Sequence, residues 1–390
     1  MKLPKNIPKT VLLLGAASFF TDVSSEGIYS ILPLFLTQVL GAGPLALGVI
    51  EGVAETTSSL LKVFSGIWTD RLRQRKPLIL WGYGLSTFAR PFIGAALSWP
   101  WVLFLRFLDR MGKGVRSSPR DALITDVTTD RNRGTAFGLH GSMDHAGALL
   151  GPLLVSLILT LGHLSLRTII YLSIVPGLIA WLTLWVVPEK KKKSGTKSVE
   201  RPDLLKGWSL MDPRFKTLLL AMFFFGLGNS TDAFLIIQLS KLGVPMNLNP
   251  LIWGLFSGVM MVTSYWGGKL SDRFGRKPLI LAGWAFYALV YFAFAHVQDP
   301  WWFTFIFLAY GTFYGLCEPS QKAFVGDMAK KTLRGTAFGL FNLTAGLAAL
   351  PASLIFGFVG QKWGYSTAFT LGACFALAAS LILLWIPSRK

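Results

Sequence analysis

The stretch Arg133-Gly-Thr-Ala-Phe-Gly-Leu139 recurs later in the chain as Arg334-Gly-Thr-Ala-Phe-Gly-Leu340. Two shorter matches lie at nearly the same offset: Lys76-Pro-Leu-Ile-Leu80 with Lys277-Pro-Leu-Ile-Leu281, and Pro100-Trp101 with Pro300-Trp301. Chance does not explain a seven-residue match that shares its offset with two others. The chain is therefore built from two related halves, each about 200 residues long.

The composition shows in which solvent these halves fold. The chain has 390 residues, of which 52% are hydrophobic and only 15% charged, whereas soluble proteins average about 25% charged residues. Because a helix that crosses a bilayer needs about 20 apolar residues, the sequence predicts an all-α membrane protein. Twelve spans are expected, at 11–38, 45–69, 77–98, 101–122, 134–160, 168–187, 216–239, 250–270, 278–297, 302–323, 335–358 and 365–386.

The net charge of +19 would favour a nucleic-acid partner if it lay on one soluble face. Nearly all of the 38 Lys and Arg residues lie instead in alternate connections between spans. Basic residues gather on the cytoplasmic side of a membrane, so both termini are expected in the cytoplasm and no nucleic-acid partner is expected. The compact loops favour a monomer in a bacterial inner membrane. The expected domains are a six-helix bundle at 1–187, a linker at 188–214 and a second six-helix bundle at 215–390.

Two loops at equivalent places carry a recognisable motif. Gly66-Ile-Trp-Thr-Asp70-Arg71 follows the second span, and Gly268-Lys-Leu-Ser-Asp272-Arg273 follows the eighth. They resemble the signature loop of the major facilitator superfamily, although the first copy has Arg73 where the pattern has glycine. The resemblance implies twelve transmembrane helices in two bundles that rock to alternate access. It also implies that Asp70, Arg71, Asp272 and Arg273 form a gate.

A second motif bears on the direction of transport. Gly147-Ala-Leu-Leu-Gly151-Pro152 in the fifth span resembles the glycine-proline motif of the drug/proton antiporters of the same superfamily. Small residues let helices pack closely, and proline bends a helix. This resemblance implies efflux from the cytoplasm, although small-residue packing alone explains the motif about equally well.

Charged residues inside spans are functional candidates by default, because each is costly to insert. The repeat acts as an internal control, since charges of the scaffold should appear in both halves. Most appear only in the first half, and only Glu26 has an acidic counterpart in the second half, Asp232. The first bundle is therefore expected to carry the proton chemistry. The candidates for substrate binding or proton coupling are Asp22, Glu26, Glu55, Arg106, Asp109, His140, Asp144, His145 and Asp232.

Arg106 requires an intramembrane anion, which Asp22, Asp109 or Asp144 could provide. The segment from Arg106 to Asp126, which includes Arg110, is far more charged than an ordinary span. Two interpretations of it stay open. It forms either an ion-pair network at the inner gate or an electropositive entrance for an anionic substrate.

Three functions remain as hypotheses. The first is a proton-coupled antiporter that exports a small organic molecule, with the proton gradient as its driving force and no bound cofactor. The second is a transporter of a divalent metal ion or a metal chelate such as a siderophore, with Asp22, Glu26, His140 and Asp144 as ligands. The third is a membrane sensor or scaffold that has lost transport. No nucleophile and base combine into an enzymatic site, so no enzyme is expected.

Overall fold

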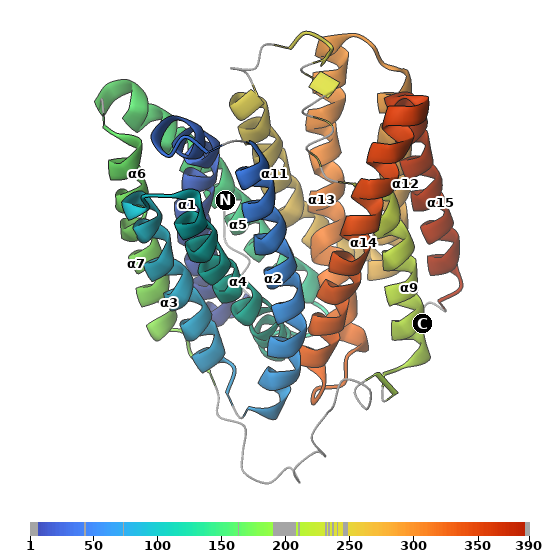
Figure 1. Ribbon diagram of the computed structural model, residues 1–390. Helices are drawn as coiled ribbons and strands as arrows, with labels where there is room; N and C mark the ends of the chain where they lie inside the picture. Colours follow the sequence, from blue (N-terminus) through green and yellow to red (C-terminus); the bar gives the residue numbers. More distant parts are fainter. Residues whose placement is uncertain are drawn as a thin grey trace. The chain divides into compact units, whose positions relative to one another are not determined.

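The computed structural model describes residues 7–42, 44–72, 74–162, 164–189, 208–209, 211–230, 232, 235, 238–239, 241–244 and 249–386. Most of the expected linker and Arg73 lie outside these ranges. The described residues form helices, and no strand occurs among them (Figure 1). Contacts divide the chain into two units. The first comprises Met1–Thr129, Met143–Gly207 and Lys331–Gly339, and the second comprises Asp130–Ser142, Trp208–Lys330 and Leu340–Lys390.

The helices of the first half match the expected spans. They are α1 (Lys9–Leu34), α2 (Pro44–Arg71), α3 (Lys76–Phe92), α4 (Trp99–Val127), α5 (Arg133–Gly162), α6 (Leu166–Leu172) and α7 (Ile174–Trp185). A π-helical turn at Phe35–Val39 continues α1. One expected span is broken at Ser173 into α6 and α7, because Pro176 has no N–H to donate to the carbonyl four residues earlier.

The second half repeats this order. Its helices are α9 (Pro213–Gly228), α11 (Asn249–Phe274), α12 (Arg276–His296), α13 (Pro300–Met328), α14 (Arg334–Trp363) and α15 (Tyr365–Leu384). Asp212 and Asp299 cap α9 and α13 by accepting backbone N–H groups of their first turns. Gly275 and Gly364 precede α12 and α15 with φ of +94° and +89°, a conformation that glycine adopts at no steric cost.

The helices differ in how apolar they are. Among the described residues, six segments are long and apolar enough to cross a membrane by length and composition: Lys9–Leu32, Arg133–Leu159, Leu166–Trp185, Arg276–His296, Arg334–Gly360 and Tyr365–Leu384. In contrast, α4 packs against α2 and α3 and buries Arg106, Asp109, Arg116 and Arg120. Its polar side chains therefore point into the first unit.

Candidate functional site

The glycines of α5 bring that helix against α1 inside the first unit. A Cβ atom on Gly147 would lie 2.3 Å from the Phe19 carbonyl oxygen and 3.0 Å from the Asp22 Cβ, and one on Gly151 would lie 2.7 Å from the Val23 carbonyl oxygen. No side chain fits at either position without moving the helices apart. The glycine-proline motif therefore sets the distance between α1 and α5 at Asp22.

Two carboxylates lie near this helix crossing. Asp22, which is half-buried on α1, is within electrostatic range of Asp144 on α5 and of Glu26 one turn along its own helix. Asp22 accepts a long hydrogen bond of 3.5 Å from Ser25 and forms no ion pair with any residue that the structure describes. Asp144 accepts a hydrogen bond from Ser18. The charge of each acid therefore opposes ionisation of the other.

A hydrogen-bonded chain runs from Asp144 to a buried arginine. The Ser18 hydroxyl donates to Asp144 and accepts from Arg120 Nη1 at 3.0 Å. Arg120 also donates from Nε to the Asp121 carboxylate at 3.2 Å. The protonation state of Asp144 is therefore linked, through one serine, to an arginine of α4.

Arg106 forms its ion pairs in a second network. It donates from Nη2 to Glu51 at 2.6 Å and from Nη1 to Asp109 at 3.3 Å. Asp109 also accepts from Arg90 Nε at 2.9 Å, and its side chain is only 2% exposed. Of the three acids that the sequence offered to Arg106, the structure selects Asp109 and adds Glu51. Arg106 therefore pairs with Asp109 and Glu51 and not with Asp22, and the cations within electrostatic range of Asp22 are Lys113 and Arg116.

Further cations of α4 follow along the helix. Arg116 is buried, with its guanidinium 4.3 Å from the centre of the Tyr83 ring and 2.7 Å from Ser86 Oγ. Arg110 is within electrostatic range of Asp109 and Glu55, so it lies in this network and not beside Asp70 or Asp272. Glu55 is exposed on α2.

The motif that ends α2, from Gly66 to Arg71, forms a latch in the first unit. The side chain of Asp70, 0% exposed, accepts hydrogen bonds from the backbone N–H groups of Gly335 and Thr336, at 2.8 and 2.6 Å. These are free N–H groups in the first turn of α14, where the helix dipole favours an anion. Gly66 lets the two helices approach, since a Cβ there would lie 2.3 Å from the Gly335 carbonyl oxygen. We call this set of contacts the α2–α14 latch.

An ion-pair bridge completes the α2–α14 latch. Arg75 donates to Asp70 at 3.4 Å and to Asp126 at 2.8 Å, and Arg334 donates to Asp126 at 2.7 Å. Burial raises the pKa of Asp70, against the opposing effects of Arg75 and the two backbone N–H groups. Burial also acts to raise the pKa of Asp126, but Arg75 and Arg334 outweigh it and hold that pKa below its ordinary value. Asp126 is thus ionised at neutral pH.

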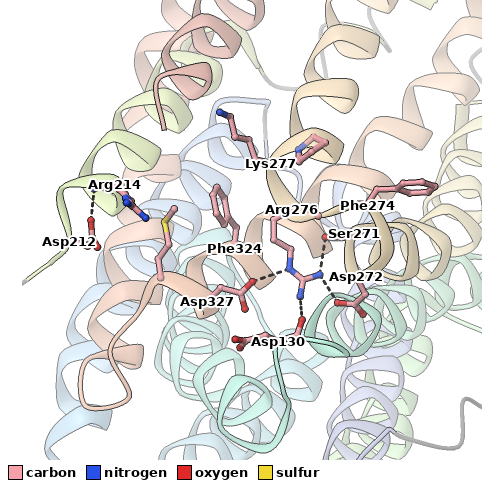
Figure 2. A pocket seen from close by; sticks show the side chains of 13 residues that line it. Asp130, Asp212, Arg214, Ser271, Asp272, Phe274, Arg276, Lys277, Phe324 and Asp327 are labelled. Atoms are coloured by element: carbon pink, nitrogen blue, oxygen red, sulfur yellow. Dashed lines mark hydrogen bonds and ion pairs between the residues drawn. The ribbon is translucent and has the colours of Figure 1, made fainter. Parts of the chain in front are cut away.

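The second unit contains an equivalent set of contacts between α11 and α5, and Figure 2 shows Arg276 of this set between Asp272 and Asp327. Asp272 accepts from the N–H groups of Gly134 and Thr135 at 2.9 and 2.6 Å. Arg276 joins Asp272 to Asp327, and Asp327 also binds Arg133. We call this set the α11–α5 latch. It borders a cavity of about 380 Å³ that Arg214, Lys277 and Phe324 also line.

The arginines of the two latches differ from those expected. Arg71 and Arg273 are exposed, and Arg273 lies over the Phe274 ring at 5.3 Å. The arginines bonded to Asp70 and Asp272 are Arg75 and Arg276, because the turn after each motif folds the following residues back onto the helix end. The sequence repeat already indicated the partners of the two latches. Asp126 recurs as Asp327, and Arg133 recurs as Arg334, at the same offset.

Asp232 lies in a different environment. It follows the end of α9 in the second unit and accepts hydrogen bonds from Tyr310 at 3.3 Å and from Tyr314 at 3.3 and 3.5 Å. Tyr310 also lies 3.1 Å from the Asn229 side-chain oxygen. The comparison of charges between the halves missed these tyrosines because they are neutral, so the second unit has a polar cluster that the sequence comparison did not indicate.

The histidines do not join the carboxylates in a metal site. Among the described residues, no group of three or more His, Cys, Asp or Glu side chains could hold a metal ion. His140 is buried on α5. The alternative ligand set Asp22, Glu26, His140 and Asp144 thus receives no support.

Comparisons with known proteins agree with this architecture. The family model described as Major Facilitator Superfamily matches residues 14–353 and again 218–390. An uncharacterized MFS-type transporter of Methanocaldococcus jannaschii is 33% identical over 388 residues, which cover 98% of this chain and 96% of that protein. The multidrug resistance protein MdtH of Sodalis glossinidius is 25% identical, over 87% of this chain and 82% of its own length. The crystal structure of the E. coli fucose:proton symporter FucP superposes with a TM-score of 0.76 at 15% identity, over 97% of this chain and 98% of that one.

Proposed function

This chain belongs to the major facilitator superfamily, and we propose that it is a proton-coupled antiporter that exports a small organic molecule from the cytoplasm. It is a membrane transporter and not an enzyme. The observation that carries the proton coupling is the contrast between the acids of the first unit. Asp109 and Glu51 pair directly with arginines, whereas Asp22 forms no such pair with a described residue and is influenced more by the acids Asp144 and Glu26 than by the cations Lys113 and Arg116.

The geometry supports Asp22 and Asp144 as the proton site. Two acids held close together by the glycines of α5 favour a state in which one proton lies between them. Movement of α1 against α5 would change their separation and so release or take up that proton. Through Ser18, the same movement would reach Arg120 on α4. These steps would couple proton exchange to a change of conformation.

Each latch supports the alternating-access part of the proposal. The α2–α14 and α11–α5 latches join the end of one helix to the first turn of another by backbone hydrogen bonds and ion pairs. Because all the bonds of one latch join the same two helix ends, separation of those ends would break them together, which suits a switch between two states. The direction, export, is supported by the glycine-proline motif and by relatives named multidrug resistance proteins.

Proton coupling can be tested before the substrate is known. Inside-out membrane vesicles that contain the protein are acidified inside, and a panel of organic compounds is added while a fluorescent dye reports the pH gradient. A compound that dissipates the gradient with the wild type, but not with Asp22→Asn, would support the antiporter. If every active compound dissipates the gradient equally with both proteins, the assignment of Asp22 is wrong.

A further inference from the structure

The second unit contains an intramembrane carboxylate that no basic residue neutralises in the described part of the chain. The hydrogen-bond partners of Asp232 are the hydroxyl groups of Tyr310 and Tyr314. Its surroundings are otherwise uncharged. An ionised carboxylate in such a place is costly unless a cation joins it. Asp109 in the first unit, which has two arginine partners, shows the usual solution.

The backbone beside Asp232 adds to the negative potential. Helix α9 ends at Gly228, and the carbonyl groups at a helix C-terminus carry a partial negative charge. The Gly228 carbonyl accepts one hydrogen bond, from Tyr287 at 2.8 Å. The side-chain oxygen of Asn229 lies on the same side, since both it and Asp232 contact the Tyr310 hydroxyl. The Asn229 and Asp232 oxygen atoms therefore meet at one hydroxyl group, and neither side chain carries a positive charge.

Aromatic rings surround these oxygen atoms. The Phe256 ring lies 5.8 Å from that of Tyr310 and 6.1 Å from that of Tyr314, and Trp253 lies 5.5 Å from Phe256. Tyr310 and Phe256 are buried, whereas Asp232 and Tyr314 are partly exposed. Asp232 and Tyr314 are thus the accessible members of this cluster, and the rings of Tyr310 and Phe256 pack behind Tyr314.

We propose that Asp232, Tyr314 and the rings behind them bind the positively charged group of a cationic organic substrate. This inference rests on the proposed function, because it identifies the substrate class of the transporter. The carboxylate attracts an organic cation by its negative charge, and the aromatic faces beside it attract the same cation by their ring quadrupoles. A small inorganic cation would gain little from the rings. It would also meet the Tyr314 hydroxyl, which already donates to the carboxylate.

A pair of probes with the same shape and opposite charge tests this directly. Tetraphenylphosphonium and tetraphenylborate are titrated into the purified full-length protein in detergent, and the melting temperature is recorded. A ligand that binds the folded protein raises this temperature by mass action. We expect a saturable rise with tetraphenylphosphonium that tetraphenylborate does not reproduce. Equal shifts with both ions would overturn the proposal.

Variants locate the site. Asp232→Asn should weaken tetraphenylphosphonium binding by roughly tenfold or more, and Asp232→Glu should restore most of it. Tyr314→Phe, which keeps the ring, should bind better than Tyr314→Leu, which removes it, since a desolvated cation–ring contact is worth roughly tenfold in affinity. Glu318→Gln is the matched control, one turn further along α13, where Glu318 already pairs with Lys322.

The outcomes separate this inference from the proposed function. Binding that is unchanged in Asp232→Asn, or an Asp232-dependent shift with sodium chloride alone, would overturn the cation site. If pH-driven transport that depends on Asp22 persists in that case, the antiporter proposal stands. Conversely, binding of tetraphenylphosphonium that depends on Asp232, in a protein without proton-driven transport, would keep the site and refute the antiporter.

Discussion

Asp126 accepts a hydrogen bond of 2.7 Å from Arg334, a residue 208 positions later in the chain. The equivalent pair, Asp327 and Arg133, is joined in the second unit. Each acid also binds the arginine that follows the motif on the neighbouring helix, Arg75 or Arg276. The structure therefore contains two copies of one switchable connection.

Breaking this pair should favour the state in which the latch is open. We expect Asp126→Asn to slow the transport cycle several-fold. The affinity for substrate should change little, because Asp126 pairs with Arg75 and Arg334 and with none of the proposed binding residues. The rate is measured as flux in proteoliposomes and the affinity as ligand-induced thermal stabilisation. Arg334→Gln should have a similar effect, and the double variant should be no worse than either single variant. Additive losses would show that the two residues act separately.

The pH dependence of stability follows from the lowered pKa of Asp126. A carboxylate whose pKa is lower in the folded state contributes stability that is complete above its ordinary pKa of about 3.9 and is lost as the pH falls through the lowered value. The difference in melting temperature between the wild type and Asp126→Asn should therefore be constant from pH 8 to pH 5. It should shrink at more acidic pH. A difference that already changes between pH 8 and pH 6 would contradict this assignment.

Gly268, on the α11 side of the α11–α5 latch, should not tolerate any side chain. A Cβ on Gly268 would lie 2.1 Å from the Gly134 carbonyl oxygen and 2.8 Å from the Gly138 Cα, and backbone atoms cannot yield as side chains do. We predict that Gly268→Ala prevents the hydrogen bonds from Gly134 and Thr135 to Asp272. The variant should then match Asp272→Asn in transport rate. Exposed Gly52, beside which a Cβ would meet no atom within 4 Å, provides the control, since Gly52→Ala should keep wild-type flux.

The buried pair Arg90 and Asp109 should matter for stability more than for coupling. Removing one partner of a buried ion pair typically costs about 3–5 kcal/mol, so Arg90→Leu should lower the melting temperature markedly by leaving Asp109 with Arg106 alone. Replacing both, as Arg90→Leu with Asp109→Leu, should restore part of the loss. If the double variant is less stable than Arg90→Leu, then Asp109 stabilises the folded protein even without Arg90, which would contradict this prediction.

Hydropathy and the repeat together predicted the positions of most helices, because burial in a bilayer is a local property of about 20 residues. The span expected at 45–69 is α2, Pro44–Arg71, and that at 278–297 is α12, Arg276–His296. The membrane-spanning fold of the superfamily is confirmed. The break between α6 and α7 was not expected, because a single proline lowers the hydropathy of a span very little.

The partners of the charges were harder to predict, since they depend on contacts between residues far apart in sequence. Treating charges found in both halves as mere scaffold directed attention away from Arg75 and Asp126, although their recurrence as Arg276 and Asp327 marks both latches. Arg106 could not be assigned to Asp109 in preference to Asp22, because Asp109 lies on α4 itself whereas Asp22 lies on α1, and the contact between α1 and α4 is not visible in the sequence. Only the packing of α5 on α1 through Gly147 shows that Asp22 faces Asp144.

The proposed proton site is tested most directly by separating exchange from accumulation in proteoliposomes. Ethidium is used as the transported probe, first in counterflow without a pH gradient and then in accumulation driven by one. The account predicts that Asp22→Asn and Asp144→Asn retain counterflow but lose accumulation, because only the second process needs a proton to bind and leave. Accumulation at the wild-type level in both variants would contradict the account.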